Sequence, residues 1–158
     1  MKLLVALMLL PAICGIANAG GAEIFNAHCA ICHQAGATGI PGMYPPLADS
    51  IGSYVAVPQG RAYLVHVVSF GLSGPISVHG QTYAGLMQSW PSLSNEEVAA
   101  VLNYILTTFN SNLLPKDFAP LTGAEVKRYR GDGVSIGALL KQREALMKTL
   151  AAGHGTGT

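Results

Sequence analysis

The chain of 158 residues is long enough for one small domain with an appendage, and its nine basic and eight acidic side chains give a formal net charge of +1. The charge is uneven, since residues 20–109 carry one basic and four acidic side chains, whereas residues 110–158 carry seven basic and four acidic ones. The first part has no basic stripe, which argues against nucleic-acid binding.

Residues 1–19 have the pattern of a secretory signal peptide, with a short basic region, an apolar stretch at residues 3–16 and a small-x-small site at Ala17-Asn18-Ala19. We predict cleavage after Ala19, with no transmembrane segment left in the mature chain. The apolar stretch of 14 residues is shorter than the roughly 20 needed to span a bilayer. Two alternatives stay open: lipidation at Cys14, which lacks the usual small residue before it, and an uncleaved signal acting as an anchor.

Residues 20–30 are predicted to form a short helix, because apolar side chains recur there at helical spacing. This helix leads into Cys29-Ala30-Ile31-Cys32-His33, the pattern of a c-type haem attachment site. Each thiol can add across one vinyl group of the porphyrin, and His33 can then reach the iron from the proximal side. One helical turn brings Cys29, Cys32 and His33 to one face, so the motif predicts one covalent haem c with its iron.

Two other interpretations of the paired cysteines fit the surrounding sequence less well. A thioredoxin-like dithiol needs a helix after the motif, whereas residues 36–46 are rich in glycine and proline and are predicted to form a loop. A zinc site needs two more thiols or imidazoles at metal spacing, and no cysteine follows Cys32. The surroundings of the motif therefore favour haem.

A second helix and a hairpin are predicted in the middle of the chain. Residues 58–69 carry a helical apolar stripe that Gly71 can end. Residues 76–78 and 81–83 flank His79-Gly80, which is the pattern of a small hairpin with a two-residue turn.

The strongest helical pattern lies at residues 94–109. Ser94 and Glu97 have the spacing of a capping box at its start. Its apolar face is formed by Val98, Val101, Leu102, Ile105 and Phe109. Three helices around a haem, without a β-rich region, predict an all-α fold in which the porphyrin supplies much of the buried apolar surface.

Four segments resemble the class I monohaem cytochromes c. They are the haem motif, Pro45-Pro46-Leu47, Tyr83-Ala84-Gly85-Leu86-Met87 and Val101-Leu102-Asn103-Tyr104-Ile105, within residues 20–109. The resemblance implies a cytochrome c fold over residues 20–109, with three main helices around one covalently bound haem. It also implies an electron carrier rather than an enzyme, so no catalytic residue is predicted.

The resemblance implies roles for four residues of the pocket besides the two cysteines. His33 is the proximal axial ligand of the iron, and Met87 is the distal one. The Pro45 carbonyl accepts a hydrogen bond from the second imidazole nitrogen of His33, which fixes the ring and its tautomer. Leu47 packs on the haem face.

Two features bear on the distal ligand. Met43 is a rival thioether, but it lies only ten residues after His33, in a segment that must still turn around the haem edge. The family usually has proline after the distal methionine, whereas Gln88 follows Met87 here, which predicts a less stiff loop.

The resemblance further implies that the first and last helices of the domain cross. Gly21 and Phe25 are expected to lie against Val101 and Tyr104, and glycine at the crossing lets the two backbones approach closely.

Five other side chains are candidates for a role at the site or elsewhere. His28 is predicted to face outward, His66 to be solvated because it lies off the apolar stripe, and His79 to occupy a turn position with positive φ. Arg61 either pairs with a haem propionate or lies on the surface. Trp90 shields the haem edge, meets a propionate, or simply packs.

Residues 71–87 resemble a subgroup of bacterial cytochromes that carry electrons beside periplasmic dehydrogenases and reductases, including domains fused to nitrite reductases. The resemblance implies a periplasmic location and redox partner proteins: a dehydrogenase as donor and an oxidase or reductase as acceptor. With His33 and Met87 both bound, the iron has no open position, which favours electron transfer over catalysis. Two alternatives stay open: a subunit of a dehydrogenase or reductase complex, and a ligand-binding or peroxidatic haem protein in which Met87 does not ligate.

Residues 110–158 are predicted to form a helical C-terminal extension. After a connector at residues 110–120, Thr122 and Glu125 have the spacing of a second capping box, opening a helix that stops at Gly131. A second helix follows, amphipathic and with its charged side chains largely off the apolar stripe. Its apolar face either packs on the acidic domain, whose charge is opposite, or docks a partner enzyme; the absence of Trp and Phe disfavours a membrane surface. The apolar stripe is Ile136, Leu139, Leu140, Leu146, Met147 and Leu150, and the charged side chains are Lys141, Arg143, Glu144 and Lys148.

Overall fold

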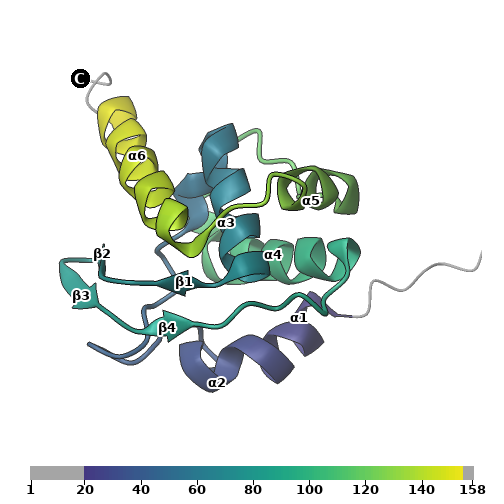
Figure 1. The fold of residues 1–158 in the computed structure, drawn as a ribbon, viewed down its shortest axis with the longest axis horizontal. Coiled ribbons are helices and arrows are strands. Elements are labelled where there is room, and N and C mark those ends of the chain that lie inside the picture. Colours follow the sequence, from purple (N-terminus) through teal and green to yellow (C-terminus); the bar gives the residue numbers. More distant parts are fainter. Residues whose placement is uncertain (1–19, 155–158) are drawn as a thin grey trace, which may run out of the picture.

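The computed structural model describes residues 20–154, so the predicted signal peptide and its cleavage site lie outside the described residues. The described chain is mainly helical and has two short antiparallel strand pairs (Figure 1). The helices are α1 (Gly21–Ile24), α2 (Ala30–His33), α3 (Pro58–Phe70), α4 (Asn95–Phe109), α5 (Gly123–Arg130) and α6 (Ile136–His154). The strands are β1 (Leu72–Ser73), β2 (Ile76–Val78), β3 (Gln81–Tyr83) and β4 (Leu86–Met87).

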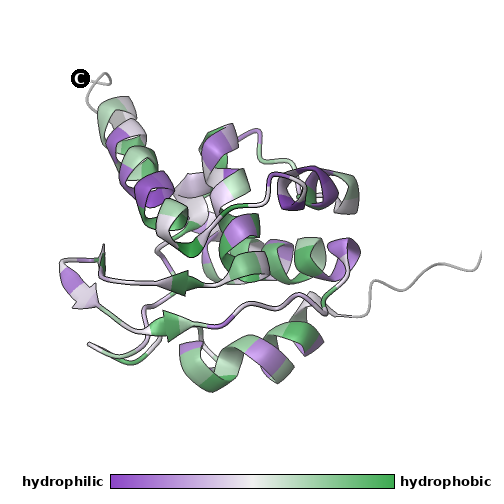
Figure 2. Ribbon diagram, in the orientation of Figure 1, coloured by the Kyte–Doolittle hydropathy of each residue, from purple (hydrophilic) through white to green (hydrophobic). Residues whose placement is uncertain are grey.

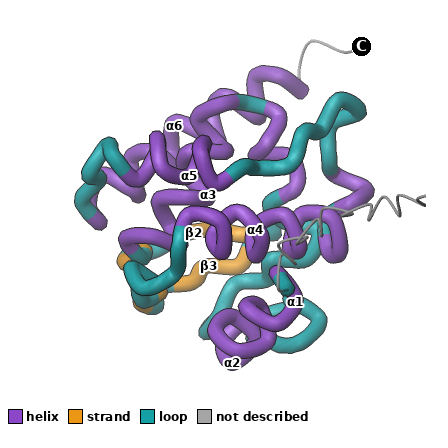
Figure 3. The backbone as a smooth tube through the Cα atoms, turned by 90° about the vertical axis from the view of Figure 1, so that its right-hand side faces the viewer, coloured by secondary structure: helices purple, strands orange, loops and turns teal. Residues whose placement is uncertain are grey.

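Helix α4 lies at the centre of the fold, between α1 and α2 on one side and α3 and α5 on the other (Figures 1 and 3). Its buried side chains include most of the predicted apolar face: Val98, Val101, Leu102 and Ile105. The capping box at its start is confirmed, because Ser94 Oγ accepts from the Glu97 N–H at 3.2 Å and Glu97 Oε2 accepts from the Ser94 N–H at 2.7 Å.

The predicted first helix is a continuous helical run that a π-helical turn, Phe25–Cys29, divides into α1 and α2. Within it the Ala30 N–H bonds the Phe25 carbonyl, and such turns are frequent at functional sites. The run crosses α4 as expected, with the Phe25 and Tyr104 ring centroids 5.7 Å apart. A Cβ at Gly21 would collide with the Ala100 carbonyl, so glycine permits this close crossing.

The middle of the chain combines predicted elements with one that the sequence does not reveal. Helix α3 ends before Gly71, which has a φ of +81°. The hairpin is confirmed: β2 pairs with β3, and the turn residues His79 and Gly80 have φ of +49° and +76°. The unpredicted element is the pair of β1 with β4, which places Leu72 opposite Met87. Strands of two residues are too short to show a period.

The C-terminal extension packs on the rest of the chain, as the first of the two alternatives for its amphipathic helix predicts. Helix α6 lies against α3 and β1, and α5 lies against α3 and α4. Leu139 and Leu146 of α6 are fully buried, as is Val126 of α5, although α5 is otherwise a hydrophilic helix (Figure 2). No helix in residues 20–154 is both long enough and apolar enough to cross a bilayer.

The arginine–carboxylate pair between the extension and the domain has the opposite sense to the net charges of the two parts. Arg61 of α3 lies 2.7 Å from the Glu125 carboxylate of α5, so in this pair the domain supplies the cation and the extension the anion. The Glu125 N–H bonds Thr122 Oγ1 at 3.2 Å, but its carboxylate is held by Arg61. The second capping box is therefore only half formed. Apolar burial, rather than net charge, accounts for the packing.

Two polar side chains that were predicted to be solvated or off the apolar stripe are buried instead. His66 is 2% exposed because α5 and α6 cover this face of α3; its Nε2 donates to the Tyr129 carbonyl at 2.9 Å. Arg143 is 8% exposed. It lies four residues after Leu139 and three before Leu146, so helical spacing places it on the buried face with both leucines.

Asn110, at the end of α4, ties that helix to the segment that precedes α3. The side chain is fully buried. Its Oδ1 accepts from the N–H groups of Ser50 at 3.0 Å, Ile51 at 3.0 Å and Gly52 at 3.1 Å. Its Nδ2 donates to the carbonyls of Leu47 at 3.0 Å and Ile105 at 3.1 Å. One side chain therefore satisfies five backbone groups.

We expect Asn110→Ala to lower the free energy of unfolding by about 3 kcal/mol or more, because it leaves several buried backbone groups without partners. The measurement is urea unfolding of the haem-loaded protein, followed by far-UV circular dichroism. Asn112→Ala is the matched control: Asn112 is exposed and should change stability by no more than about 0.5 kcal/mol. Equal effects of the two substitutions would contradict the role of Asn110.

Candidate haem site

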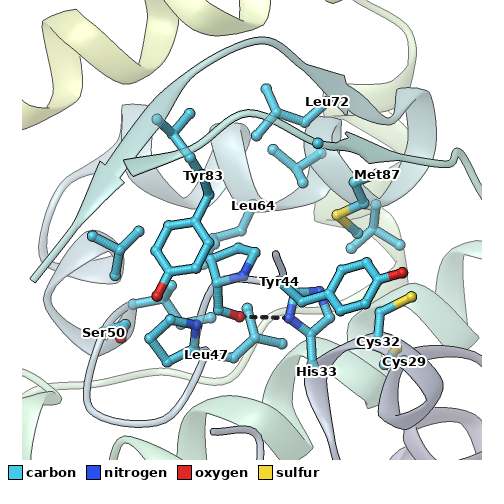
Figure 4. A pocket seen from close by; sticks show the side chains of 18 of the residues that line it. Cys29, Cys32, His33, Tyr44, Leu47, Ser50, Leu64, Leu72, Tyr83 and Met87 are labelled. Carbon is cyan, nitrogen blue, oxygen red and sulfur yellow. Dashed lines mark hydrogen bonds between the residues drawn. The ribbon is translucent and has the colours of Figure 1, made fainter. Parts of the chain in front are cut away.

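A cavity of about 550 Å³ opens between α2, α3, α4 and the strands, and it is lined mainly by apolar side chains. Its size falls within the roughly 300–1,000 Å³ of cofactor pockets. Cys29, Cys32 and His33 form part of one wall, and Leu64, Leu72 and Met87 lie across the cavity from His33 (Figure 4). The prediction that one helical turn directs Cys29, Cys32 and His33 to one face is therefore confirmed.

The Cys29 thiol does not have the environment of a reactive redox thiol. Burial, together with the neighbouring Cys32, raises the pKa of the Cys29 thiol to about 11. A dithiol that exchanges with disulfides requires the opposite, a thiol whose pKa is lowered so that the thiolate forms near neutral pH. The structure thus disfavours the thioredoxin-like interpretation of this motif.

His33 is held by the hydrogen bond that the sequence resemblance implies. Its Nδ1 donates to the Pro45 carbonyl at 2.8 Å, which leaves Nε2 without the proton and able to bind a metal. Burial lowers the pKa of His33, and the Pro45 hydrogen bond opposes this shift. A neutral imidazole with one fixed tautomer is the form that ligates iron.

Gly39 allows the loop to deliver the Pro45 carbonyl to His33. It has a φ of +65°, and a side chain there would collide with the backbone of Tyr44 and Pro45. The Gly39 N–H also bonds the His33 carbonyl at 2.9 Å, so the same turn holds the end of α2.

Met87 is placed by the strand pair that the sequence does not reveal. Its strand β4 pairs with β1, and the close approach of Gly71 to the Met87 carbonyl leaves no room for a Cβ at residue 71. This pairing restrains the backbone at Met87 although Gln88, rather than proline, follows. Met43, the rival thioether, is 56% exposed at the rim.

Some of the remaining candidate residues line the cavity, and others make contacts elsewhere. Leu47 lines the cavity. His28 does not simply face outward, since it is half-buried with its ring centroid 4.5 Å from that of Trp90, and both residues line the cavity. Arg61 neither lines the cavity nor stands free on the surface, because it bonds Glu125 and the Ala119 carbonyl. Sequence reasoning did not connect Arg143 with the cavity that it lines, although the helical spacing described above was a usable signal.

The donor set and the cavity fit a covalent haem. Two thiols lie together at one edge, an imidazole nitrogen is free on one wall, a thioether lies on the facing wall, and the space between is apolar. A helical fold of this size with such a site defines a c-type cytochrome.

Comparison with known proteins agrees. The family described as Cytochrome c matches residues 19–109. A cytochrome c-552 of Thermus thermophilus is 41% identical over 145 residues, covering 92% of this chain and 97% of that protein. The cytochrome c subunit of a quinone-dependent alcohol dehydrogenase from Gluconacetobacter polyoxogenes is 31% identical over 120 residues, covering 76% of this chain but 24% of that subunit.

The chain belongs to the cytochrome c family. The predicted all-α cytochrome c fold is therefore confirmed, as is the predicted cofactor, covalent haem c with its iron. Membership of this family supports a role in electron transfer.

Proposed function

We propose that this protein is an exported, free electron carrier that moves single electrons between redox enzymes of the periplasm. Cys29 and Cys32 hold the haem through thioethers, and His33 and Met87 bind its iron from opposite faces. The observation that supports this most directly is the placement of a free imidazole nitrogen and a restrained thioether on facing walls of one apolar cavity.

The haem supplies a one-electron couple, and the residues of the chain keep its surroundings constant during transfer. The Pro45 carbonyl fixes the His33 ring, and the β1–β4 pair fixes the backbone of Met87. Two permanent ligands leave no position for substrate. Apolar walls limit water around the site, so few groups need to move when the charge changes.

Residues 1–19 support export, because they combine a short apolar stretch with a small-x-small site. Cleavage after Ala19 would begin the mature protein at Gly20, ahead of α1. After cleavage, Cys29 and Cys32 would be the only cysteines of the chain, so no third cysteine of the protein would compete for either thiol.

A subunit of a larger enzyme is the second candidate, favoured by the similarity to the alcohol dehydrogenase subunits. The fraction of each relative's length that this chain covers favours the free carrier. The chain accounts for 97% and 98% of the two Thermus cytochromes c-552, but for only about a quarter of the dehydrogenase subunits.

The test is purification of the tagged, haem-loaded protein from the periplasm of its own host. A free carrier should begin at Gly20 by mass spectrometry, elute as a monomer without a stoichiometric partner, and take up one electron per chain in a redox titration. A dehydrogenase or reductase that co-purifies at constant ratio would support the subunit alternative instead. A ferric protein that binds cyanide at once would contradict both, because a ligand-binding haem would then be present.

A further inference from the structure

Arg143, which α6 brings from the C-terminal extension, is the only lysine or arginine among the described residues that line the haem cavity, and none of these residues is Asp or Glu. The side chain is 8% exposed. Its guanidinium donates to the Tyr54 hydroxyl at 2.8 Å and to the Ser77 carbonyl at 2.8 Å, and both acceptors are neutral. Within residues 20–154 it forms no salt bridge with a carboxylate.

A buried cation that has only neutral partners is costly unless an anion arrives to neutralise it. Of the two half-buried arginines, Arg61 lies 2.7 Å from the Glu125 carboxylate, whereas Arg130 donates to the neutral Ser69, Asn95 and Trp90 oxygens. Arg143 differs from both because it is buried and lines the haem cavity. The Tyr63 side chain is a third hydrogen-bonding partner of Arg143. The guanidinium has five N–H groups, more than these three neutral partners use, and the bonds hold it in place. The structure thus provides a positioned cation whose anion is not a side chain of the described chain.

The chemistry of haem places carboxylates near this part of the cavity. The vinyl groups and the two propionates lie on opposite edges of the porphyrin, so thioethers at Cys29 and Cys32 direct the propionates toward the other end. Figure 4 shows Ser50 and Tyr83 at the end of the cavity away from the cysteines. Arg143 bonds residues close to these two in the chain or the hairpin: Tyr54 lies four residues after Ser50, and Ser77 pairs with Thr82, the neighbour of Tyr83.

We propose that Arg143 is the counter-ion of a haem propionate, so that the C-terminal extension completes the haem pocket. This inference rests on the attachment of haem at Cys29 and Cys32 in the function proposed above. An arginine–carboxylate pair in a cavity with apolar walls is stronger than one in water, because its hydrogen bonds are charge-assisted and little screened.

The other titratable groups that face this end of the cavity come from several elements. Tyr54 lies in the 3₁₀ helix Gly52–Ala56, Tyr63 in α3 and Tyr83 in β3. Burial raises the pKa of Tyr63, and Arg143 opposes this shift. His79, from the hairpin turn, lines a smaller adjoining hollow together with Arg143.

The test measures the reduction potential of the haem-loaded protein against pH in Arg143→Gln and in Lys148→Gln. Lys148 is exposed on the same helix, so the control loses the same charge without touching the cavity. In the parent protein the paired propionate stays ionised and the potential should be nearly flat from about pH 5 to about pH 8. In Arg143→Gln the propionate loses its cation, its pKa rises through this interval, and the potential should be lower at high pH and climb as pH falls.

Two further variants test whether the change in the pH profile has another cause. Arg143→Lys keeps the charge and should restore much of the flat profile. His79→Gln combined with Arg143→Gln should keep the new pH dependence, which would disappear if His79 were its source. If Arg143→Gln does not accumulate, the parent protein is studied instead, by NMR at varied pH with ¹³C in the propionate carboxyl groups of its haem. One carboxyl resonance should not titrate in this interval, and titration of both would overturn the proposal.

Failure of this inference can be told apart from failure of the proposed function. Loss of covalent haem or of the Met–iron absorption band in the parent protein would count against the ligands themselves. An unchanged band and covalent haem, together with identical potential profiles for Arg143→Gln and Lys148→Gln, would overturn the role of Arg143 alone.

Discussion

Replacing both Cys29 and Cys32 with alanine should release the haem to acid-acetone extraction and leave little folded protein. They are the only thiols in residues 20–158, and haem c is tied to its protein through thioethers. The cavity of about 550 Å³ is bounded by side chains of the core, including Leu64, Val101 and Leu102, which would face an empty space or water without haem. Because a ligand that binds only the folded state stabilises it by mass action, loss of the tether also weakens the fold.

The measurements for this prediction are the pigment left in the protein after acid-acetone and the thermal unfolding curve of the variant. Each single substitution, Cys29→Ala or Cys32→Ala, is the matched control and should retain one thioether and part of the covalent pigment. Covalent haem in the double variant would mean that the attachment site lies elsewhere in the chain.

The second large effect is expected for Met87→Ala. This substitution should abolish the Met–iron absorption band of the ferric protein, lower the reduction potential and allow cyanide to bind. The physical reason is that a soft thioether favours ferrous iron and occupies the distal position, so its loss removes both effects. Loss of the band together with the fall in potential shows that the ligand, rather than only the packing around it, has changed.

Met43→Ala is the control for the distal ligand, since it removes the other thioether that lines the cavity. Met43 is 56% exposed, so its loss should leave the band, the potential and the response to cyanide unchanged. The reverse pattern, with an altered spectrum in Met43→Ala alone, would show that the assignment to Met87 is wrong while the family remains right.

Many of the secondary-structure elements could be predicted from local features of the sequence. The capping box of Ser94 and Glu97 marks the start of α4, and His79-Gly80 marks the hairpin, because caps and two-residue turns are formed by residues close in sequence. The haem motif is local in the same sense, since Cys29, Cys32 and His33 lie within about one helical turn. Their joint exposure to the cavity follows from the helix alone.

The sequence analysis did not predict, or predicted wrongly, the features that depend on a partner distant in sequence. Glu125 was expected to cap its own helix, but Arg61, which lies 2.7 Å away, holds its carboxylate. His66 looked solvated because its own helix has a separate apolar stripe, whereas α5 and α6 cover it. The hydrogen bonds of Asn110 join groups about 60 positions apart, and no local pattern reports them.

By itself, the sequence predicted haem attachment at Cys29 and Cys32 and indicated where most of the helices begin and end, because these properties depend on residues within a few positions of one another. Only the tertiary structure decided that β1 restrains Met87, that the extension packs on its own domain, and that Arg143 reaches the haem cavity. These outcomes depend on which distant surfaces bury one another, and burial is set by the packing of the whole chain rather than by any one segment.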